Sequence, residues 1–414
     1  MRKCKGFILM AAVMMAVSWS AVAGAADIVI GYSGPLSGPA AEYGEDCLNG
    51  VDLAIQELNA KGGITVKGRN YTFRLEKMDD RVDPATAVSN AVQLRKEHKV
   101  IAIFNPVANT IAAMMKINQE KRNEFLIMAY TSMPQISEMG NKLLLALTQP
   151  FTIYVKTQAD IAWDRGWRKG AMVVTAGPYG ETWRKAFSEQ WVKKGGTIAF
   201  DQPANYYTRT DFAAPLAGAL ETNPDFLLIG GPSSTTALLI EQARARGFEG
   251  GFVMIEQAKM DTIAQVMEKP LLLEGVIGLA RVSDVTFPAS AAFTYNYTTN
   301  YKRQLTWESV VNYIAMHALA KAIVAANTPD DAIAIRAALP RVFPMLGDQY
   351  PLEYFGVTSN GRLISAAAVQ TMKHGRFTQP ILYAWWPKTQ KEFEQVQKTT
   401  KMSIPMTWRN TGDL

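Results

Sequence analysis

Cysteine is almost absent from this chain of 414 residues, which contains only Cys4 and Cys47. Cys4 precedes an apolar run from Phe7 to Val17, and we expect it to be removed together with that run. Cys47 is then the one cysteine of the mature chain, which excludes an intramolecular disulfide. Its place in an apolar helical pattern favours a small buried residue over a reactive thiol.

Histidine is nearly as rare, and the sequence offers no set of metal ligands. His98, His317 and His374 fall on unrelated segments, and none has a Cys or Glu at the spacing of a zinc site. The carboxylate pair Asp79–Asp80 lies at a strand end beside Arg81, where a solvated loop is the simpler interpretation. We therefore expect neither a metal nor another cofactor.

Common enzyme motifs are also missing. Residues 30–46, IGYSGPLSGPAAEYGED, place a glycine-rich loop between a strand and a helix, which is a layout typical of phosphate binding. Gly31, Gly34 and Gly38 do not match G-x-G-x-x-G, and no G-K-[ST] follows them. GYSGP is not the G-x-S-x-G of a nucleophile elbow. The sequence therefore favours a protein that is not an enzyme.

Excess charge of one sign is lacking as well. The formal net charge is +6, and removal of Arg2, Lys3 and Lys5 leaves 40 basic against 37 acidic residues, or +3. No run of basic residues alternates with aromatic ones. This charge balance argues against nucleic acid and anionic membranes as partners, and we expect neither.

A long hydrophobic run is missing after the first residues of the chain. The N-terminus has a basic start, the short apolar run and the small residues AGAA, which together are typical of a secretory signal. We expect residues 1–26 to be a cleavable signal peptide. The mature protein is then predicted to lie in the periplasm, without a lipid anchor.

What the sequence does contain is a regular alternation of strand and helix patterns. Short runs rich in Val, Ile and Leu, such as VIAIF and FLLIGG, are typical of strands buried on both faces. The alternation runs from residue 27 to about 131 and restarts at about 151. The fold class is therefore α/β, with two doubly wound parallel-sheet lobes. Helices are expected at 110–123, 151–165, 181–194, 211–221 and 234–246.

The last third of the chain is predicted to complete both lobes. Residues 289–339 are mostly helical in pattern, and LEGVIGLARVSD before them is extended. A strand pair is expected around His374–Gly375.

Four stretches carry a likeness to a known family: GPLSGPAAEYGEDCLNGVDLAIQELNAKGGI, DDRVDPATAVSNAVQL, PYGETW and DFAAPLAGALETNPDFLLIGG. They resemble the leucine/isoleucine/valine-binding proteins, which are type I periplasmic binding proteins of ATP-driven transporters. The likeness covers most of the mature chain.

The resemblance implies two lobes that are joined by a hinge of three strands and close on a small ligand. The crossings are expected near 146–150, 275–282 and 345–354. The N-terminal lobe then comprises residues 27–147 and 281–347, and the C-terminal lobe residues 148–280 and 348–414. The glycine–proline loop would form a wall of the cleft, where glycine admits close approach of a ligand.

The resemblance also implies site residues. Tyr43 and Tyr179 match the aromatic positions that cover the ligand from the two lobes. Glu256 resembles the acid that pairs with the ligand's ammonium group. Thr131 and Ser132 match a strand end that holds the amino acid.

The loop FNPVANT departs from the family, which has small or hydroxyl residues where Val107 and Ala108 stand. Asn109 and Thr110 could still donate to a carboxylate at the following helix N-terminus. Pro232 stands where amino-acid binders of the family can present a tyrosine. These departures concern the class of ligand and leave the fold unaffected.

Three functions stay open from the sequence. The first is a monomeric periplasmic receptor that binds an amino acid with an apolar side chain and delivers it to an inner-membrane ABC permease. The second keeps the fold but binds an aromatic or other organic carboxylate. The third is a secreted enzyme on a two-lobed α/β scaffold, which turnover of a bound compound would reveal.

Overall fold

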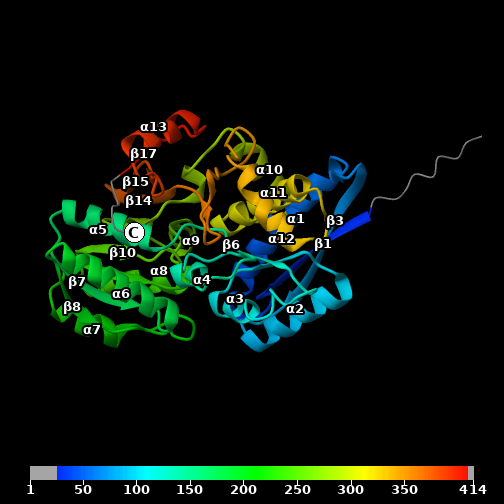
Figure 1. Cartoon of the computed structure of the whole chain (residues 1–414). Helices are drawn as coiled ribbons and strands as arrows, with labels where there is room; N and C mark the ends of the chain where they lie inside the picture. Colours follow the sequence, from blue (N-terminus) through cyan, green and yellow to red (C-terminus); the bar gives the residue numbers. More distant parts are fainter. Residues whose placement is uncertain (1–25, 409–414) are drawn as a thin grey trace, which may run out of the picture.

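The computed structural model describes residues 26–408 and shows two lobes side by side (Figure 1). The predicted signal peptide therefore lies outside the described residues, apart from Ala26 at the start of the first strand. The first lobe, on the right of Figure 1, contains the blue and cyan segments, and the second contains the green ones.

The first sheet has six strands in the order β2-β3-β1-β4-β5-β6. All neighbours are parallel except the edge strand β2, which runs antiparallel to β3. The bounds are β1 Ala26–Gly34, β2 Ile64–Val66, β3 Arg69–Asp79, β4 Ala102–Asn105, β5 Leu126–Ala129 and β6 Leu144–Ala146.

The second sheet repeats this order with β8-β7-β9-β10-β11 and then continues through β14, β16 and β17. The first five strands are parallel, whereas β14 runs antiparallel to both of its neighbours in the sheet. The bounds are β7 Lys169–Val174, β8 Thr197–Asp201, β9 Phe226–Gly230, β10 Gly251–Met254, β11 Ile277–Leu279, β14 Ala367–Lys373, β16 Ile381–Tyr383 and β17 Met406–Thr407.

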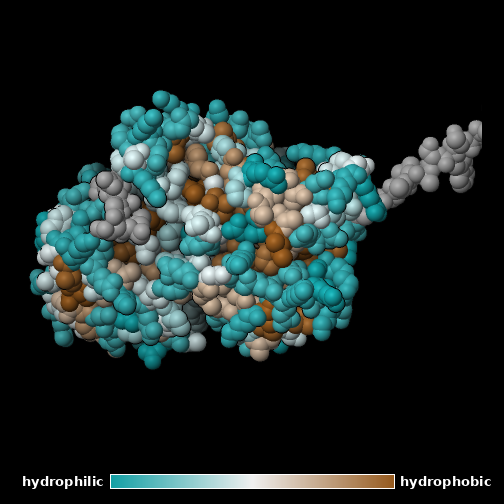
Figure 2. All heavy atoms as spheres, in the orientation of Figure 1, coloured by the Kyte–Doolittle hydropathy of each residue, from teal (hydrophilic) through white to brown (hydrophobic). Residues whose placement is uncertain are grey.

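The central strands of both sheets are buried along their whole length, as their apolar sequences predict. Every residue of β4, β5, β9 and β10 is buried, since helices cover both faces of each sheet. Hydrophilic side chains dominate the face shown in Figure 2, where hydrophobic ones form only small separate patches. The predicted fold class, α/β with two doubly wound lobes, is confirmed.

The helices follow the predicted alternation. In the first lobe they are α1 Ala41–Ala60, α2 Pro84–His98, α3 Ala108–Met114, α4 Pro134–Glu138, α10 Ser290–Tyr301, α11 Trp307–Ala326 and α12 Ala332–Ala338. In the second they are α5 Thr152–Asp164, α6 Pro178–Lys193, α7 Ala213–Glu221, α8 Ser233–Ala245 and α9 Met260–Val266, while α13 Gln390–Thr399 precedes β17. Short 3-10 turns are η1 Gly38–Ala40, η2 Pro270–Leu273, η3 Val282–Asp284 and η4 Leu339–Val342.

Helix α11 is the one described helix that is long and apolar enough to cross a membrane by length and composition. Of its most hydrophobic window, 78% is buried inside the protein, where α11 packs along α1. Its first turn is held by a capping box between Thr306 and Ser309. The hydrophobicity of α11 therefore serves the core of the first lobe.

Helix α3 is shorter than predicted, since it ends at Met114 and not near residue 123. Turns follow it, and the Asn118 amide donates to the Phe125 carbonyl in place of a continuing helix. Arg122 has a left-handed backbone with φ 72°, which a helix does not permit. Polar side chains that bond the local backbone thus overrode the helical pattern.

The chain passes between the lobes three times. The first two passages follow β6 and β11, whereas the third lies between the hairpin β12 Gly356–Val357/β13 Leu363–Ile364 and β14. Arg362 in that hairpin pairs with Ala146 of β6, so the hairpin lies beside the first sheet. The third crossing thus comes after the predicted 345–354, which packs in the core of the first lobe through Met345 and Tyr354. The domain boundaries stay a prediction.

The predicted strand pair at the end of the chain is confirmed. Strand β14 turns at His374–Gly375 and pairs with β15 Arg376–Phe377, with Lys373 opposite Arg376. Both turn residues have positive φ, 52° and 70°, as a two-residue hairpin loop requires.

Candidate ligand-binding site

The same Tyr–Gly pair begins a helix at matching places in the two lobes. Tyr43–Gly44 lies in the first turn of α1, after β1, and Tyr179–Gly180 in the first turn of α6, after β7. A Cβ on Gly44 would lie 1.7 Å from the Pro35 carbonyl oxygen, and one on Gly180 1.7 Å from that of Thr175. Only glycine lets the helix start so close to the strand end, and this brings each tyrosine to the carboxyl edge of its sheet.

The close approach at these glycines is made by the chain itself. A Cβ on Gly34 would meet the Tyr32 hydroxyl at 2.6 Å, and that hydroxyl donates to the Gly44 carbonyl at 2.7 Å. At Gly34 and Gly44 the missing side chain makes room for the chain itself, and the role of the loop as a wall of the cleft stays a prediction. These two glycines let the loop pack closely against α1.

Tyr43 is held within the first lobe. Its hydroxyl donates to the Pro106 carbonyl at 3.0 Å, and its ring lies 6.0 Å from the ring of Tyr130. Burial raises the pKa of Tyr43 well above its usual value, so its hydroxyl stays neutral. The role of Tyr43 towards a ligand stays a prediction.

Tyr179 stands on the second lobe and contacts its own helix. Its hydroxyl accepts from Trp183 Nε1 at 3.0 Å, and its ring meets Phe151 edge-on with 6.3 Å between centroids. Burial, and then the negative charge of Glu256, raise the pKa of Tyr179 well above the ordinary range. Tyr179 and Glu256 therefore lie close enough to interact at the same edge of the second sheet.

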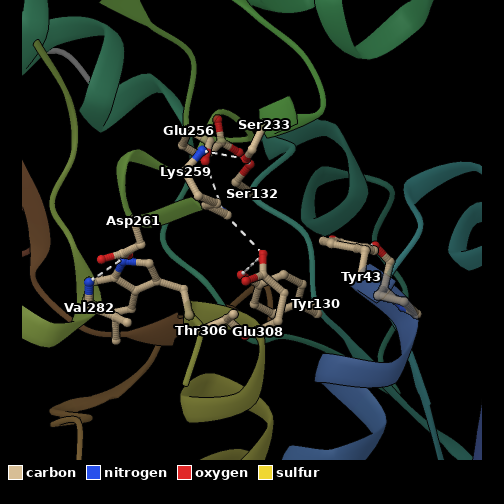
Figure 3. Close-up of polar contacts among 12 residues, drawn as sticks. Tyr43, Tyr130, Ser132, Ser233, Glu256, Lys259, Asp261, Val282, Thr306 and Glu308 are labelled. Atoms are coloured by element: carbon tan, nitrogen blue, oxygen red, sulfur yellow. Dashed lines mark hydrogen bonds and ion pairs between the residues drawn. The ribbon is translucent and has the colours of Figure 1, made fainter. Parts of the chain in front are cut away.

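The predicted residues Ser132 and Glu256 meet across the two lobes (Figure 3). Ser132 follows β5 of the first lobe, and its Oγ donates to Glu256 Oε1, which follows β10 of the second. Thr131 and Ser132 are 8% and 9% exposed, so this contact is shielded from water. The carboxyl ends of both sheets thus face each other, which is where doubly wound sheets bind ligands.

The second carboxylate oxygen of Glu256 is buried without a partner. Among the described residues, Glu256 Oε2 has no hydrogen-bond partner, although the Tyr179 hydroxyl lies beside this carboxylate. A buried carboxylate oxygen that lacks a donor is costly, because it has lost water without replacement. Glu256 is therefore equipped to accept a donor from outside the chain.

An ion pair also joins the lobes beside Glu256. Lys259 Nζ of the second lobe lies 3.2 Å from Glu308 Oε1 in the first turn of α11, and it donates to the Glu256 carbonyl at 2.9 Å. Tyr130 donates to the same Glu308 oxygen at 3.2 Å (Figure 3). The side chains of Lys259 and Glu308 are 16% and 4% exposed, so the pair is largely dry.

The side chains of Asn109 and Thr110 make local hydrogen bonds at the start of α3. Thr110 Oγ1 donates to Asn105 Oδ1 and to the Val107 carbonyl, both at 2.8 Å, and Thr110 is buried. Asn109 is exposed, and its side-chain oxygen accepts the Thr110 amide at 2.9 Å. The structure shows neither residue in contact with Ser132 or Glu256, and their role as carboxylate ligands stays a prediction.

The departures from the family pattern occupy helix starts. Val107 is the N-cap residue of α3, Ala108 begins that helix, and Pro232 is the N-cap of α8. Ser233, next to Pro232, accepts the Lys259 amide at 3.0 Å and so helps to place the lysine.

Three residues at this site were not predicted from the sequence: Tyr130, Lys259 and Glu308. Tyr130 directly precedes Thr131, and Lys259 follows Glu256 by three residues. Their nearness in sequence to predicted site residues was a signal that could have identified both. The pattern T-W-E-S marks the start of α11 and places Glu308 in its first turn. Its partner Lys259 is 49 positions away, and no local pattern could identify that pair.

Metal binding finds no support in residues 26–408, where no group of three or more His, Cys, Asp or Glu could hold an ion. The half-buried Asp261 accepts the Val282 amide at 3.1 Å, and loss of hydration raises the pKa of Asp261 to about 6. This acid lies near the second crossing between the lobes and anchors backbone there.

Comparison with known proteins places these features in a family. The periplasmic binding protein family matches residues 27–376. The Leu/Ile/Val-binding protein of Escherichia coli (strain K12) is 27% identical over 250 residues, which span 60% of this chain and 66% of that protein. The aligned part thus spans just under two thirds of this relative.

Two solved structures show the same fold. A branched-chain amino acid transporter substrate-binding protein from Streptococcus pneumoniae, in complex with isoleucine, has a TM-score of 0.72 and 19% identity, and covers 86% of this chain and 99% of that one. A solute-binding protein from R. palustris, in complex with benzoate, has a TM-score of 0.69 and 16% identity, over 85% and 95% of the two chains. The chain belongs to the periplasmic binding protein family, and within it resembles the Leu/Ile/Val-binding proteins.

Proposed function

We propose that this protein is a periplasmic receptor for an amino acid with an apolar side chain, which it delivers to an inner-membrane ABC permease. The observation that carries the proposal is Glu256 Oε2, a buried carboxylate oxygen without a donor at the interface between the lobes. An ammonium group supplies both the donor and the opposite charge.

The charges around Glu256 favour a ligand with a cationic group. Glu256 and Glu308 bring two carboxylates to the interface, whereas Lys259 brings one ammonium group, which already pairs with Glu308. A ligand ammonium group would therefore meet an acid that has no cation of its own. A second anion at the same place would be repelled at short range in a medium of low dielectric constant.

The remaining parts of an amino acid have matching groups nearby. The strand end Thr131–Ser132 offers hydroxyl and backbone donors to the carboxylate. Tyr43 and Tyr179 offer apolar ring faces to the side chain, one from each lobe. The Leu/Ile/Val-binding relatives bind ligands of this kind by name, which supports a branched-chain amino acid here.

The other functions make different predictions. An organic carboxylate such as benzoate, which the R. palustris protein holds, would lack the ammonium group for Glu256. An enzyme would convert a bound compound into a product. Stoichiometric binding of an unchanged amino acid separates the receptor from both.

We expect a screen of thermal stability to detect the ligand. A ligand at one hundred times its dissociation constant stabilises the folded state by about 2.7 kcal/mol. L-leucine, L-isoleucine or L-valine should raise the melting temperature of the mature protein, whereas benzoate should leave it unchanged. D-leucine serves as the control, because it carries the same groups with the opposite configuration at the α-carbon. A shift by benzoate alone would replace the proposed ligand with a plain carboxylate.

We further expect the ligand to shift the protein towards a closed form. A ligand can reach Glu256 only when the lobes separate, because the contacts of Ser132 and Lys259 across the lobes close the approach. Binding should then favour the form in which both lobes touch the ligand. X-ray scattering in solution should show a smaller radius of gyration at saturation. An identical profile with and without ligand would indicate a rigid site.

A further inference from the structure

Arg362 lies close to the proposed site, although it is distant from it in sequence. Its backbone amide donates to Thr358 Oγ1 at 2.8 Å, and the preceding carbonyl, that of Gly361, accepts the Ala146 amide at 2.9 Å. The residue is 3% exposed. The hairpin β12/β13 therefore fixes Arg362 between the end of β6 and the loop that follows β5.

The guanidinium of Arg362 binds that loop with both of its terminal nitrogens. Nη1 donates to the Thr131 carbonyl at 3.1 Å and to the Thr148 carbonyl at 2.6 Å. Nη2 donates to the Met133 carbonyl at 2.8 Å and to Ser137 Oγ at 2.8 Å. A single buried side chain thus ties the strand end that carries Ser132 to the first connection between the lobes.

The acceptors of Arg362 are all neutral. No carboxylate of residues 26–408 forms an ion pair with it. Burial lowers the pKa of the Arg362 guanidinium to about 10, so it stays protonated at neutral pH. The negative charge of Glu138 acts on Arg362 without forming an ion pair with it. Arg362 therefore has no direct carboxylate partner, and its positive charge favours an anion on the far side of the loop.

The peptide between Thr131 and Ser132 connects this charge to the site. In a trans peptide the C=O and N–H bonds point in opposite directions, so the Ser132 N–H points away from Arg362. Among the described residues, the Ser132 amide makes no hydrogen bond, whereas its neighbours Thr131 and Met133 both do. A hydrogen bond to the carbonyl polarises the peptide and strengthens its N–H as a donor.

We propose that Arg362 is a positioning residue for the carboxylate of the ligand: it holds the Thr131–Met133 loop and polarises the Ser132 amide, which donates to that carboxylate. This inference rests on the proposed function as an amino-acid receptor. The carboxylate would then bind at the first lobe, beside the Ser132 side chain that contacts Glu256. The ammonium group, paired with Glu256, would bind at the second.

The test compares two ligands on one substitution. Arg362→Lys keeps a positive charge but cannot make four hydrogen bonds in a fixed plane. Calorimetric titration should show that it weakens L-leucine binding by about tenfold or more, since bonds to a charged group are the stronger ones. Leucine amide has the same side chain and ammonium group but no carboxylate, and its affinity should change by about threefold or less. An equal loss for both ligands would indicate a structural role and overturn the inference.

Arg244→Lys is the matched control. Arg244 also donates to backbone carbonyls, those of Phe248, Gly250, Leu272 and Glu274, but within the second lobe and away from Ser132. The control should leave the affinity for leucine unchanged. The melting temperature of each variant separates a loss of folding from a loss of binding.

A second measurement needs no substitution. In an NMR experiment, threonine labelled with ¹³C at the carbonyl carbon and serine labelled with ¹⁵N leave signals only from Thr–Ser peptide bonds. The sequence has two of these, Thr131–Ser132 and Thr358–Ser359. With L-leucine, the Ser132 amide proton should move downfield, as expected for a new bond to a carboxylate, whereas exposed Ser359 should stay in place. Leucine that binds without moving the Ser132 signal would overturn the inference and leave the proposed function standing. If no amino acid binds, the proposed function fails, and the inference fails with it.

Discussion

Glu256→Gln should lower the affinity of this protein for its amino acid by about a hundredfold or more. Glutamine keeps the size of the side chain and one acceptor, but it removes the charge that meets the ligand's ammonium group. Loss of one partner from a buried ion pair costs on the order of 3–5 kcal/mol, and about 1.4 kcal/mol corresponds to a tenfold change in affinity. The measurement is calorimetric titration of both proteins with the amino acid that the stability screen returns.

Glu249→Gln provides the control for this change, because Glu249 is an exposed acid of the same lobe. It should leave the affinity unaltered. If the ligand is instead a plain carboxylate, Glu256→Gln removes a neighbouring negative charge, and the affinity should hold or rise. An amino acid that binds both proteins equally would refute the role given to Glu256.

Lys259→Met should open the protein and weaken binding by about tenfold to a hundredfold. Methionine leaves the Glu308 carboxylate buried, with Tyr130 as its one side-chain donor among residues 26–408, at a cost that can reach several kcal/mol. That cost applies only to the closed form, since separation of the lobes returns Glu308 to water. The population of the binding-competent form, and with it the apparent affinity, should therefore fall.

The double variant Lys259→Met/Glu308→Gln tests this explanation. It removes both charges, so no unpaired carboxylate is left in the closed form, and affinity should recover above that of Lys259→Met. Scattering of the ligand-free proteins should show the largest radius of gyration for the single variant. Lys269→Met, at an exposed lysine, controls for the substitution itself. Losses that simply add in the double variant would mean that the two residues are not coupled.

Local patterns in the sequence predicted most of the fold. The apolar runs of β4, β9 and β10 and the spacing of apolar residues in α1 are properties of neighbours in the chain, and the structure confirms them. The hairpin at His374–Gly375 follows from turn chemistry that two residues supply. The prediction of α3 to residue 123 was wrong because the Asn118 side chain bonds to the backbone of Phe125, just before β5.

The candidate site could be predicted only in part. Glu256 and Ser132 follow strand ends, and the two Tyr–Gly pairs lie in the first turn of the helix after a strand. The carboxyl ends of parallel strands share one edge of a sheet. Motifs of that kind place a residue at the edge but do not say which residue faces it from the other lobe. The contact between Ser132 and Glu256 joins positions 124 apart, and it depends on how the lobes pack.

The composition and periodicity of this chain were enough to specify two α/β lobes, because burial and hydrogen bonding within each strand and helix depend on nearby residues. The partners of Lys259 and Arg362 depend on packing between segments that are far apart in sequence. Glu308 lies 49 positions from Lys259, and the Thr131 carbonyl lies 231 positions from Arg362. Ion pairs and buried hydrogen bonds act over a few ångströms in space, and only the folded chain brings these groups within that range.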